Sequence, residues 1–517
     1  MNFFSNFGGS KFNNSAIKPT TPTIRREVRP LAKPSNGHRN GIRSSATSFS
    51  HRLNGRSASS HLLSTLQTRP AQPQKSRVST IRKGTKRKSP TPSVPLFSES
   101  SEESEIKSGG EILRSSKRPK RKKSPEPDRK RRIRDVSNWS EDGVSTFPIV
   151  HGVDLTSGET AKDYKSAFDA SAQLVDVELQ YPSASQKEKF QLVTTDKHRE
   201  YLPLDDIVHT ITQILTHYLS HDTSGPLLDD STGVPFRLTR AHKHNDLSEY
   251  QSILTEFNDL ILRLRNDSTI ATVLDTMPRI PLALIERVLS QVYSRAVSPR
   301  IHLLGRYENG TDNVYGELLP LFISQIFRDT HLNSDSVFLD LGSGVGNVVL
   351  QAALEVGCES WGIEMMPNPC ELARAQATEF PARCRMWGLA VGSVSLLQGD
   401  FLDDARLGAV LRKADVVLVN NQAFLPKLND NITTLLLDLK EGAKVVSLKS
   451  FVPSGWKLTS RTSGDPKGVL EVEQKEYWSK CVSWTDIGGE YFIATKNSSR
   501  LARYLEGPTK TGARERM

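Results

Sequence analysis

The sequence lacks long hydrophobic runs. Nowhere in its 517 residues is there an uninterrupted apolar stretch of about 18 residues, the length that a membrane-spanning helix needs. The first residues also lack a charged segment followed by an apolar core, which a secretory signal would have. We therefore expect neither a membrane protein nor a secreted one, but an intracellular protein.

Cysteine is scarce too, with four residues in the whole chain. They are Cys358, Cys370, Cys384 and Cys481. No two of them form a CxxC pair, and no cluster of histidines accompanies them. This pattern predicts reduced, buried thiols rather than a disulfide framework or a zinc site.

Acidic residues are rare in the N-terminal part of the chain. Residues 1–134 hold 31 Lys and Arg against 8 Asp and Glu, a net charge of +23. The remaining residues hold 38 basic and 50 acidic side chains, a net charge of −12. The chain therefore joins a basic arm to a mildly acidic body.

The arm, residues 1–140, is rich in Ser, Pro, Asn and Arg and has no sustained helical or strand periodicity. Such a segment buries too little apolar surface to offset its conformational entropy, so we expect disorder. Three basic runs lie in it: Arg82–Lys88, Lys117–Lys123 and Arg129–Arg132. They predict a nuclear localisation signal, a contact with the phosphate backbone of DNA, or both.

Amphipathic helix patterns dominate from about residue 160 to 300. Apolar residues recur at helical spacing over Leu204–Leu219, and again over Leu247–Leu264, where Asp246 is a candidate N-cap. A third pattern opens with Pro281 in its first turn and continues to Val292. We expect a helical subdomain over 160–300 whose apolar stripes form its core.

The pattern then changes to short apolar runs that alternate with helices, which is typical of a parallel α/β sheet. The predicted strands are Val337–Leu341, Ser360–Ile363, Val394–Leu397, Val416–Val419, Val445–Leu448 and two near Val482–Trp484 and Tyr491–Ala494. The predicted helices include Asn347–Glu355 and 367–385. We expect a doubly wound sheet that ends in a hairpin.

A glycine-rich turn, Gly342-x-Gly344-x-Gly346, follows the first of these strands. Glycines at such a turn let a ligand approach backbone N–H groups closely, although a tight packing turn is an alternative. Glu364 ends the second strand, 24 residues after Asp340, where a carboxylate can accept hydrogen bonds from both ribose hydroxyls. Together these features predict a nucleoside-containing cofactor.

Asp400 and Phe401 follow the third strand. A carboxylate there can accept a hydrogen bond from an adenine amino group, and an aromatic ring can cover the adenine face. The alternative is that Asp400 caps the next helix.

Several segments, in this order, resemble the disruptor-of-telomeric-silencing (Dot1) histone methyltransferases, most of all the fungal type. They are 314–320 (VYGELLP), 340–347 (DLGSGVGN), 420–424 (NNQAF), Lys449-Ser450, 483–485 (SWT) and 488–491 (GGEY). The resemblance spans about residues 160–500. One departure is Gln422, where the family usually has an aromatic residue in the pocket wall.

The resemblance implies a class I S-adenosylmethionine-dependent methyltransferase, an α/β fold with a Rossmann-like seven-stranded sheet. It divides the chain into the disordered arm (1–140), the helical subdomain (160–300), the methyltransferase domain (301–500) and a flexible tail (501–517). The cofactor-binding residues that it implies are Tyr315, Gly316, Glu317, Leu318, Phe338, Leu339, Asp340, Leu341, Gly342, Ser343, Gly344, Val345, Gly346, Asn347, Glu364, Asp400 and Phe401. No metal is implied.

Within this set, the resemblance places Glu317 opposite the ammonium group of the cofactor's methionine part. For the transfer itself it implies Asn420, whose amide oxygen would orient the incoming amine, and the channel residues Phe424, Trp484 and Tyr491. For Trp484 and Tyr491 a place in the core of the hairpin is the alternative.

The implied reaction is methylation of lysine 79 in the globular core of nucleosomal histone H3. The implied partners are the nucleosome, its DNA through the arm, and histone H2B carrying ubiquitin. The resemblance further implies a nuclear monomer with roles in telomeric silencing, transcription and the DNA-damage checkpoint.

Two other functions fit parts of the sequence. A nucleic-acid N-methyltransferase would explain the turn and the basic arm, but its usual Pro-Pro-aromatic turn is absent from Asn421-Gln422-Ala423. A non-catalytic chromatin-binding protein is the other, and the retained Asp340, Glu364 and Asn420 argue against it.

Overall fold

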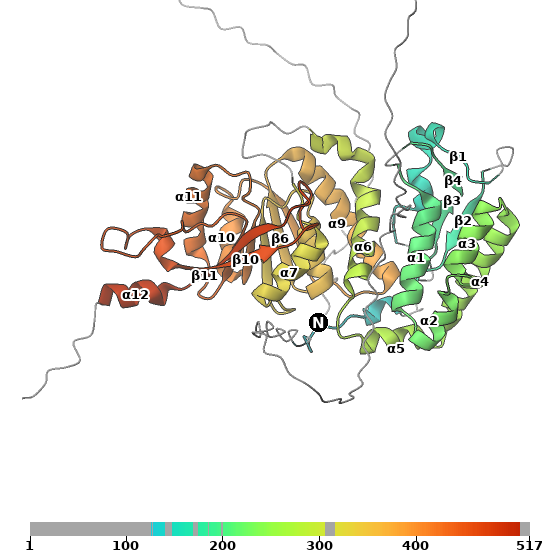
Figure 1. The fold of residues 1–517 in the computed structure, drawn as a ribbon, viewed down its shortest axis with the longest axis horizontal. Helices are drawn as coiled ribbons and strands as arrows, with labels where there is room; N and C mark the ends of the chain where they lie inside the picture. Colours follow the sequence, from blue (N-terminus) through green and yellow to red (C-terminus); the bar gives the residue numbers. More distant parts are fainter. Residues whose placement is uncertain are drawn as a thin grey trace, which may run out of the picture. The chain divides into compact units, whose positions relative to one another are not determined.

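The computed structural model describes most of the chain beyond the basic arm (Figure 1). The described residues are 126, 128–139, 147–168, 174–184, 186–197, 200–305 and 316–506. The predicted tail is described as far as residue 506, where helix α12 (Ser498–Glu506) ends. Among the described residues, no helix has both the length and the apolar character to cross a membrane.

A seven-stranded sheet forms the centre of the C-terminal half. Its strands are β5 (Val337–Leu341), β6 (Glu359–Glu364), β7 (Val394–Gln398), β8 (Val416–Val419), β9 (Lys444–Ser447), β10 (Leu470–Tyr477) and β11 (Gly489–Lys496). Their order across the sheet is β10-β11-β9-β8-β5-β6-β7. Strands β5 to β9 run parallel, whereas β11 is antiparallel to both β9 and β10. This confirms the doubly wound sheet that ends in a hairpin.

Strand β8 shows why apolar runs without alternation form this sheet. All four of its residues are buried, and successive side chains point to opposite faces. Val417 and Val419 belong to one hydrophobic cluster, while Val416 and Leu418 belong to the cluster on the other face. Helices therefore cover both sides, as parallel sheets require.

Five helices pack around these strands. They are α7 (Pro320–Thr330), α8 (Asn347–Gln351), α9 (Pro367–Trp387), α10 (Ala405–Lys413) and α11 (Pro426–Leu435). Helix α8 continues into one π-helical turn, Ala352–Val356, so the helix predicted over Asn347–Glu355 is present.

One strand of the predicted hairpin is misplaced. The prediction near Val482–Trp484 is wrong, because the partner of β11 is β10, and Val482 forms only isolated bridges with Leu318 and Thr485. Strand β10 is an edge strand in which Glu and Gln occupy the exposed positions, so its sequence has no apolar run.

The N-terminal half contains the three predicted helices and three shorter ones. They are α1 (Pro203–His217), α2 (His221–Leu227), α3 (Val234–Lys243), α4 (Leu247–Asn266), α5 (Thr269–Thr276) and α6 (Leu282–Ala296). The Asp246 side chain accepts a hydrogen bond from the Glu249 N–H at 2.9 Å, which confirms this residue as the N-cap of α4. Pro281 is the N-cap of α6 rather than part of its first turn.

The segment before α1 differs from the helical pattern expected from residue 160. It forms two short antiparallel pairs, β1 (Lys165–Ser166) with β4 (Val193–Thr194), and β2 (Asp176–Leu179) with β3 (Glu188–Gln191). Alternation explains the second pair, because β2 exposes its acidic residues and buries Val177 and Leu179.

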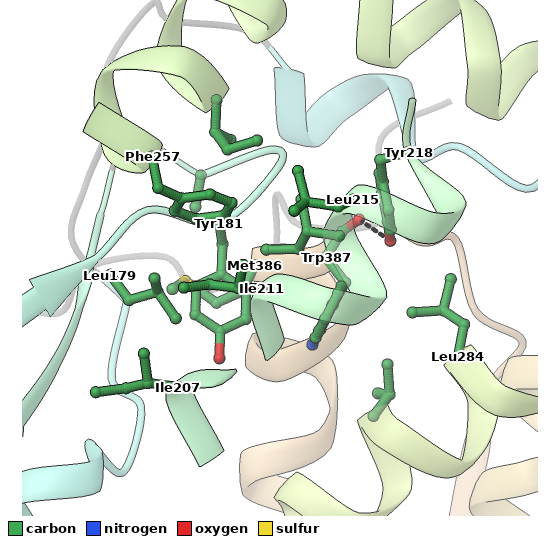
Figure 2. Close-up of a cluster of buried hydrophobic side chains, with 14 of the residues drawn as sticks. Leu179, Tyr181, Ile207, Ile211, Leu215, Tyr218, Phe257, Leu284, Met386 and Trp387 are labelled. Atoms are coloured by element: carbon green, nitrogen blue, oxygen red, sulfur yellow. Dashed lines mark hydrogen bonds between the residues drawn. The ribbon is translucent and has the colours of Figure 1, made fainter. Parts of the chain in front are cut away.

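One hydrophobic cluster joins the helical part to the helical segment 347–356 and to helix α9 of the sheet part. Helices α6 and α9 contact each other along their lengths (Figure 1). At the end of α9, the Trp387 ring packs against Tyr181 with 5.2 Å between ring centroids. The Tyr218 hydroxyl donates to the Trp387 carbonyl at 2.8 Å (Figure 2). Trp387 Nε1 donates to Gln291 Oε1 at 2.9 Å. Residues of the helical part therefore hold the C-terminal end of helix α9.

A buried ion-pair network reinforces this junction. The Glu188 carboxylate of β3 accepts from Arg295 of α6 at 2.7 Å and from Arg383 of α9 at 2.6 Å, and all three side chains are fully buried. Arg295 also binds Asp206 of α1 at 2.7 Å. Burial raises the pKa of Glu188, but the two arginine charges outweigh it and lower that pKa to about 2.

Residues 128–135, which we call the strap, pack onto the sheet part before the predicted start of order. Ile133 is buried, and its carbonyl accepts from the Ala390 N–H at 2.8 Å. Arg131 donates to the Leu354 carbonyl at 2.9 Å and to the Ala390 carbonyl at 2.5 Å. At least one cation of the third basic run therefore has a structural role.

Candidate active site

A cavity of about 380 Å³ opens where β5, β6 and β8 end. Most of the side chains and glycines that line it were predicted as site residues. These are Gly316, Glu317, Leu318, Asp340, Gly342, Ser343, Gly344, Val345, Asn347, Glu364, Asp400, Phe401, Asn420 and Phe424. The carboxyl ends of parallel strands, beside the point where strand order reverses, are the usual ligand site of such sheets.

The glycine-rich turn connects β5 to α8 and needs its glycines for backbone reasons. Gly342, Gly344 and Gly346 have φ angles of +84°, +55° and +91°, which side chains disfavour. A Cβ at Gly346 would also come within 2.8 Å of Leu396 Cδ1. Gly346 is therefore a packing glycine, while Gly342 and Gly344 line the cavity.

Glu364 is oriented by the turn itself. Its Oε2 accepts from the Gly344 N–H at 3.0 Å and its Oε1 accepts from the Met366 N–H at 2.7 Å. Each carboxylate oxygen has a further lone pair, so the group can still accept from two hydroxyls. Burial raises the pKa of Glu364 and outweighs these hydrogen bonds.

Asp340 lines the same cavity as Glu364. Its side chain is almost fully buried. Burial, followed by the negative charge of Glu364, raises the pKa of Asp340 to about 7. Two carboxylates in one cavity create a negative potential that a cationic ligand would relieve.

Glu317 enters the cavity from the segment before α7, and several elements fix it. Asn347 Nδ2 donates to Glu317 Oε1 at 3.1 Å. Main-chain groups of Glu317 bind Ser483 twice, N–H to Oγ at 2.9 Å and carbonyl to N–H at 2.9 Å. Burial, then the charge of Glu317 and a hydrogen bond with it, raise the pKa of Tyr293 well above its usual value. Glu317 thus connects α6, α8 and the loop before β11.

Asp400 and Phe401 line the far end of the cavity. Asp400 Oδ1 accepts from the Leu402 N–H at 2.9 Å, which fixes the carboxylate in a turn. The cap of α10 is a different residue, Asp404, whose carboxylate accepts from the Arg406 N–H at 2.9 Å. Asp400 therefore does not cap α10.

Asn420 follows β8 and presents an unused acceptor. Its Nδ2 donates to the Gly316 carbonyl at 3.0 Å. Among the described residues, its Oδ1 is buried and receives no hydrogen bond. A buried acceptor left unpaired costs about 1–3 kcal/mol, so this atom is suited to accept a hydrogen bond from a ligand.

The three predicted channel residues have different surroundings in the structure. Phe424 lines the cavity. The Trp484 ring covers Gly316, where a Cβ would lie 2.8 Å from the ring, and 40 % of Trp484 is exposed, so it is not hairpin core. Tyr491 is fully buried against Phe322, does not line the cavity, and its hydroxyl donates to Asp329 of α7.

Of the remaining predicted residues, three are buried core residues of β5 and one lies outside the described residues. Phe338, Leu339 and Leu341 are buried in the core beneath the turn and do not line the cavity. Tyr315 lies outside the described residues.

Sequence reasoning missed part of the cavity wall. The missed lining residues are Val348, Met365, Met366, Leu402, Leu418 and Leu428. Most of them directly follow a predicted residue or lie one turn beyond it, a signal that could have found them. Tyr293 lies far from the motifs in the sequence and offered no such signal.

The comparisons with known proteins agree with this geometry. A family model described as "Histone methylation protein DOT1" matches residues 293–496. A protein named "Histone-lysine N-methyltransferase, H3 lysine-79 specific" from Aspergillus fumigatus is 50 % identical over 420 residues, which cover 81 % of this chain and 83 % of that protein. The chain belongs to the DOT1 family.

Two further DOT1 relatives carry the same printed name. The one from Emericella nidulans is 50 % identical over 75 % of this chain and 78 % of its own length. The one from Chaetomium globosum is 46 % identical over 74 % of this chain and 73 % of its own length.

This membership and the strand order establish a class I methyltransferase fold, and S-adenosylmethionine is the methyl donor of this enzyme. The residues present fit that donor. They offer a carboxylate with free lone pairs at the end of β6, acidic groups for a cation, and a turn that can approach a ligand closely.

Proposed function

We propose that this chain methylates lysine 79 in the globular core of histone H3, with nucleosomes as the preferred substrate. The buried Oδ1 of Asn420, which has no donor in the part of the chain that the structure describes, carries the proposal, because it offers a hydrogen-bond acceptor to an amine that enters the cavity. The printed names of the DOT1 relatives support the choice of histone and lysine.

The donor, when bound, supplies an electrophilic methyl group on a positively charged sulfur. In the proposed arrangement Glu364 accepts from the ribose hydroxyls, Asp400 and Phe401 hold adenine, and Glu317 faces the ammonium group. Asp340 and the turn from Gly342 to Asn347 line the same cavity. The hydrogen bonds of Glu364 and Glu317 to fixed groups support these roles.

The chain's own contribution to transfer is alignment and desolvation. Asn420 Oδ1 accepts a hydrogen bond from the incoming amine and so directs the nitrogen lone pair. Phe424 and Trp484 form apolar walls, and an apolar channel beside a positive charge lowers the pKa of a lysine amine. The neutral amine is the nucleophile, so no strong general base is required.

We further propose that residues 1–125 bind nucleosomal DNA and direct the protein to the nucleus, and that the enzyme acts as a monomer. The charge of this segment supports the DNA contact: it holds 26 Lys and Arg against 6 Asp and Glu, a net of +20. Stimulation by histone H2B carrying ubiquitin, and roles in silencing, transcription and the checkpoint, are proposed from family membership.

The test supplies the purified protein and labelled S-adenosylmethionine with nucleosomes, free histone H3, naked DNA or RNA, and maps the label by mass spectrometry. We expect label on lysine 79 of histone H3, strongest with nucleosomes. Label on nucleic acid would instead establish a nucleic-acid methyltransferase. Absence of label despite cofactor binding, with nucleosomes that carry ubiquitin on H2B included, would overturn the proposed activity.

A further inference from the structure

Gln376 of α9 does not line the cavity, yet it contacts a residue that does. Its side chain is almost fully buried. Nε2 donates to the Val345 carbonyl at 2.7 Å and to Asn347 Oδ1 at 2.9 Å. Asn347 in turn donates from Nδ2 to Glu317 Oε1 at 3.1 Å. These contacts form a chain of hydrogen bonds from α9 to the cavity.

The chemistry of each group fixes the direction of this chain. A backbone carbonyl can only accept, so the atom of Gln376 that faces Val345 must be its NH2 group. The second hydrogen of that NH2 group then requires an acceptor, which makes the facing atom of Asn347 its oxygen. The NH2 group of Asn347 is thereby directed to Glu317, whose carboxylate only accepts. The orientation of the Gln376 amide is therefore matched to the orientation of the Asn347 amide.

We infer that Gln376 is a positioning residue for the methionine end of the cofactor site. Without it, Asn347 Oδ1 loses its hydrogen-bond donor, so the Asn347 amide is held less firmly, and so is the Glu317 carboxylate to which that amide donates. Gln376 therefore acts on cofactor binding through Asn347 and Glu317. This inference depends on the proposed place of the donor's ammonium group beside Glu317.

The test compares Gln376→Met with the unmodified chain in the binding of two ligands. S-adenosylmethionine has the amino-acid part, and methylthioadenosine has the same adenine and ribose, with a neutral thioether sulfur and no amino-acid part. We expect Gln376→Met to raise the Kd of S-adenosylmethionine about 5- to 10-fold, the effect of removing one hydrogen bond, and to leave the Kd of methylthioadenosine unchanged. Equal weakening of both ligands, or of neither, would overturn the inference.

Gln351→Met is the matched control. Gln351 is an equally buried glutamine whose Nε2 donates to the Pro320 carbonyl at 2.9 Å and to Glu355 at 2.9 Å, and it does not line the cavity. Its substitution is expected to lower the melting temperature and leave the ratio of the two Kd values unchanged.

A double-mutant cycle tests the route through Asn347. In an Asn347→Ala background, Gln376→Met is expected to cause no further selective loss of S-adenosylmethionine affinity. A full additional loss would contradict it. If Gln376→Met does not fold, Gln376→Ala replaces it, because a smaller side chain fits the same space. Both ligands bind without histone, so failure here is distinct from failure to methylate histone H3.

Discussion

Asn420 and Asn421 are neighbours in the chain, but their side-chain amides have opposite surroundings. Asn420 Oδ1 is buried beside the cavity without a donor among the described residues. Asn421 Oδ1 accepts from the N–H groups of Leu448 and Lys449 at 3.0 and 2.8 Å, and Nδ2 donates to Asn429 and to the Lys449 carbonyl at 2.8 and 2.9 Å. One amide is available for a ligand, and the other joins β8 to the end of β9.

Asn420→Ala is therefore expected to retain S-adenosylmethionine binding and lose turnover. The loss of an oriented acceptor at the reacting amine should lower kcat about 100-fold or more, while the Kd of the donor changes less than about 3-fold. Calorimetric binding and nucleosome methylation measure the two effects. A fully active variant would remove Asn420 from the mechanism.

Asn421→Ala is expected to act on stability instead. The substitution leaves the backbone N–H groups of Leu448, which is buried, and of Lys449, which is partly buried, without an acceptor, and a buried unpaired donor costs about 1–3 kcal/mol. We expect the free energy of unfolding to fall by roughly 2–4 kcal/mol, measured by urea denaturation. An unchanged midpoint would mean that water or a rearranged loop replaces these hydrogen bonds.

Asp340 makes the stability of the fold depend on pH. Its pKa rises from 3.8 in the unfolded chain to about 7 in the fold. A raised pKa contributes stability at low pH that is lost as the pH rises through 7. Asn does not ionise, so Asp340→Asn has no such loss. The free energy of unfolding of Asp340→Asn minus that of the unmodified chain should therefore be about 2–3 kcal/mol larger at pH 8 than at pH 5.

Urea denaturation of both proteins at the two pH values measures this difference. If the two proteins differ by the same free energy of unfolding at pH 5 and at pH 8, Asp340 ionises normally in the fold.

Arg383→Met should destabilise the junction between α9 and β3. It leaves Glu188 buried with only one of its two charged partners, and the loss of one member of a buried network costs about 3–5 kcal/mol. Arg237→Met is the control, since Arg237 pairs with Glu256 at the surface and such pairs contribute at most about 1 kcal/mol. Similar effects of the two substitutions in urea denaturation would contradict this account.

The basic arm is expected to increase activity on nucleosomes and not on free histone H3. Deletion of residues 1–125 should reduce nucleosome methylation. It should also make nucleosome binding depend less steeply on salt: the slope of log affinity against log salt should fall by about 0.9 for each DNA phosphate that these residues no longer neutralise. Deletion of residues 1–134 also removes Ile133 and Arg131 of the strap, and should lower the melting temperature as well. Equal nucleosomal rates with and without residues 1–125 would refute a recruitment role.

Elements with strong local signals could be predicted from the sequence. The apolar runs at β5 and β8 have the predicted bounds, the Asp246 cap is present, and the glycine-rich sequence after β5 forms a turn with positive φ at all three glycines. These features depend on period, propensity and backbone conformation, which act over a few residues.

Other features depend on contacts between residues that are distant in sequence, and these could not be predicted. The edge strand β10 has charged exposed positions, so its pairing with β11 and not its composition makes it a strand. Tyr293 and Asn347 contact Glu317, and Gln376 contacts Asn347, because α6, α8 and α9 pack together. Tyr491 turns toward α7 and away from the cavity for the same reason. Packing between elements sets these positions, and no local pattern encodes it.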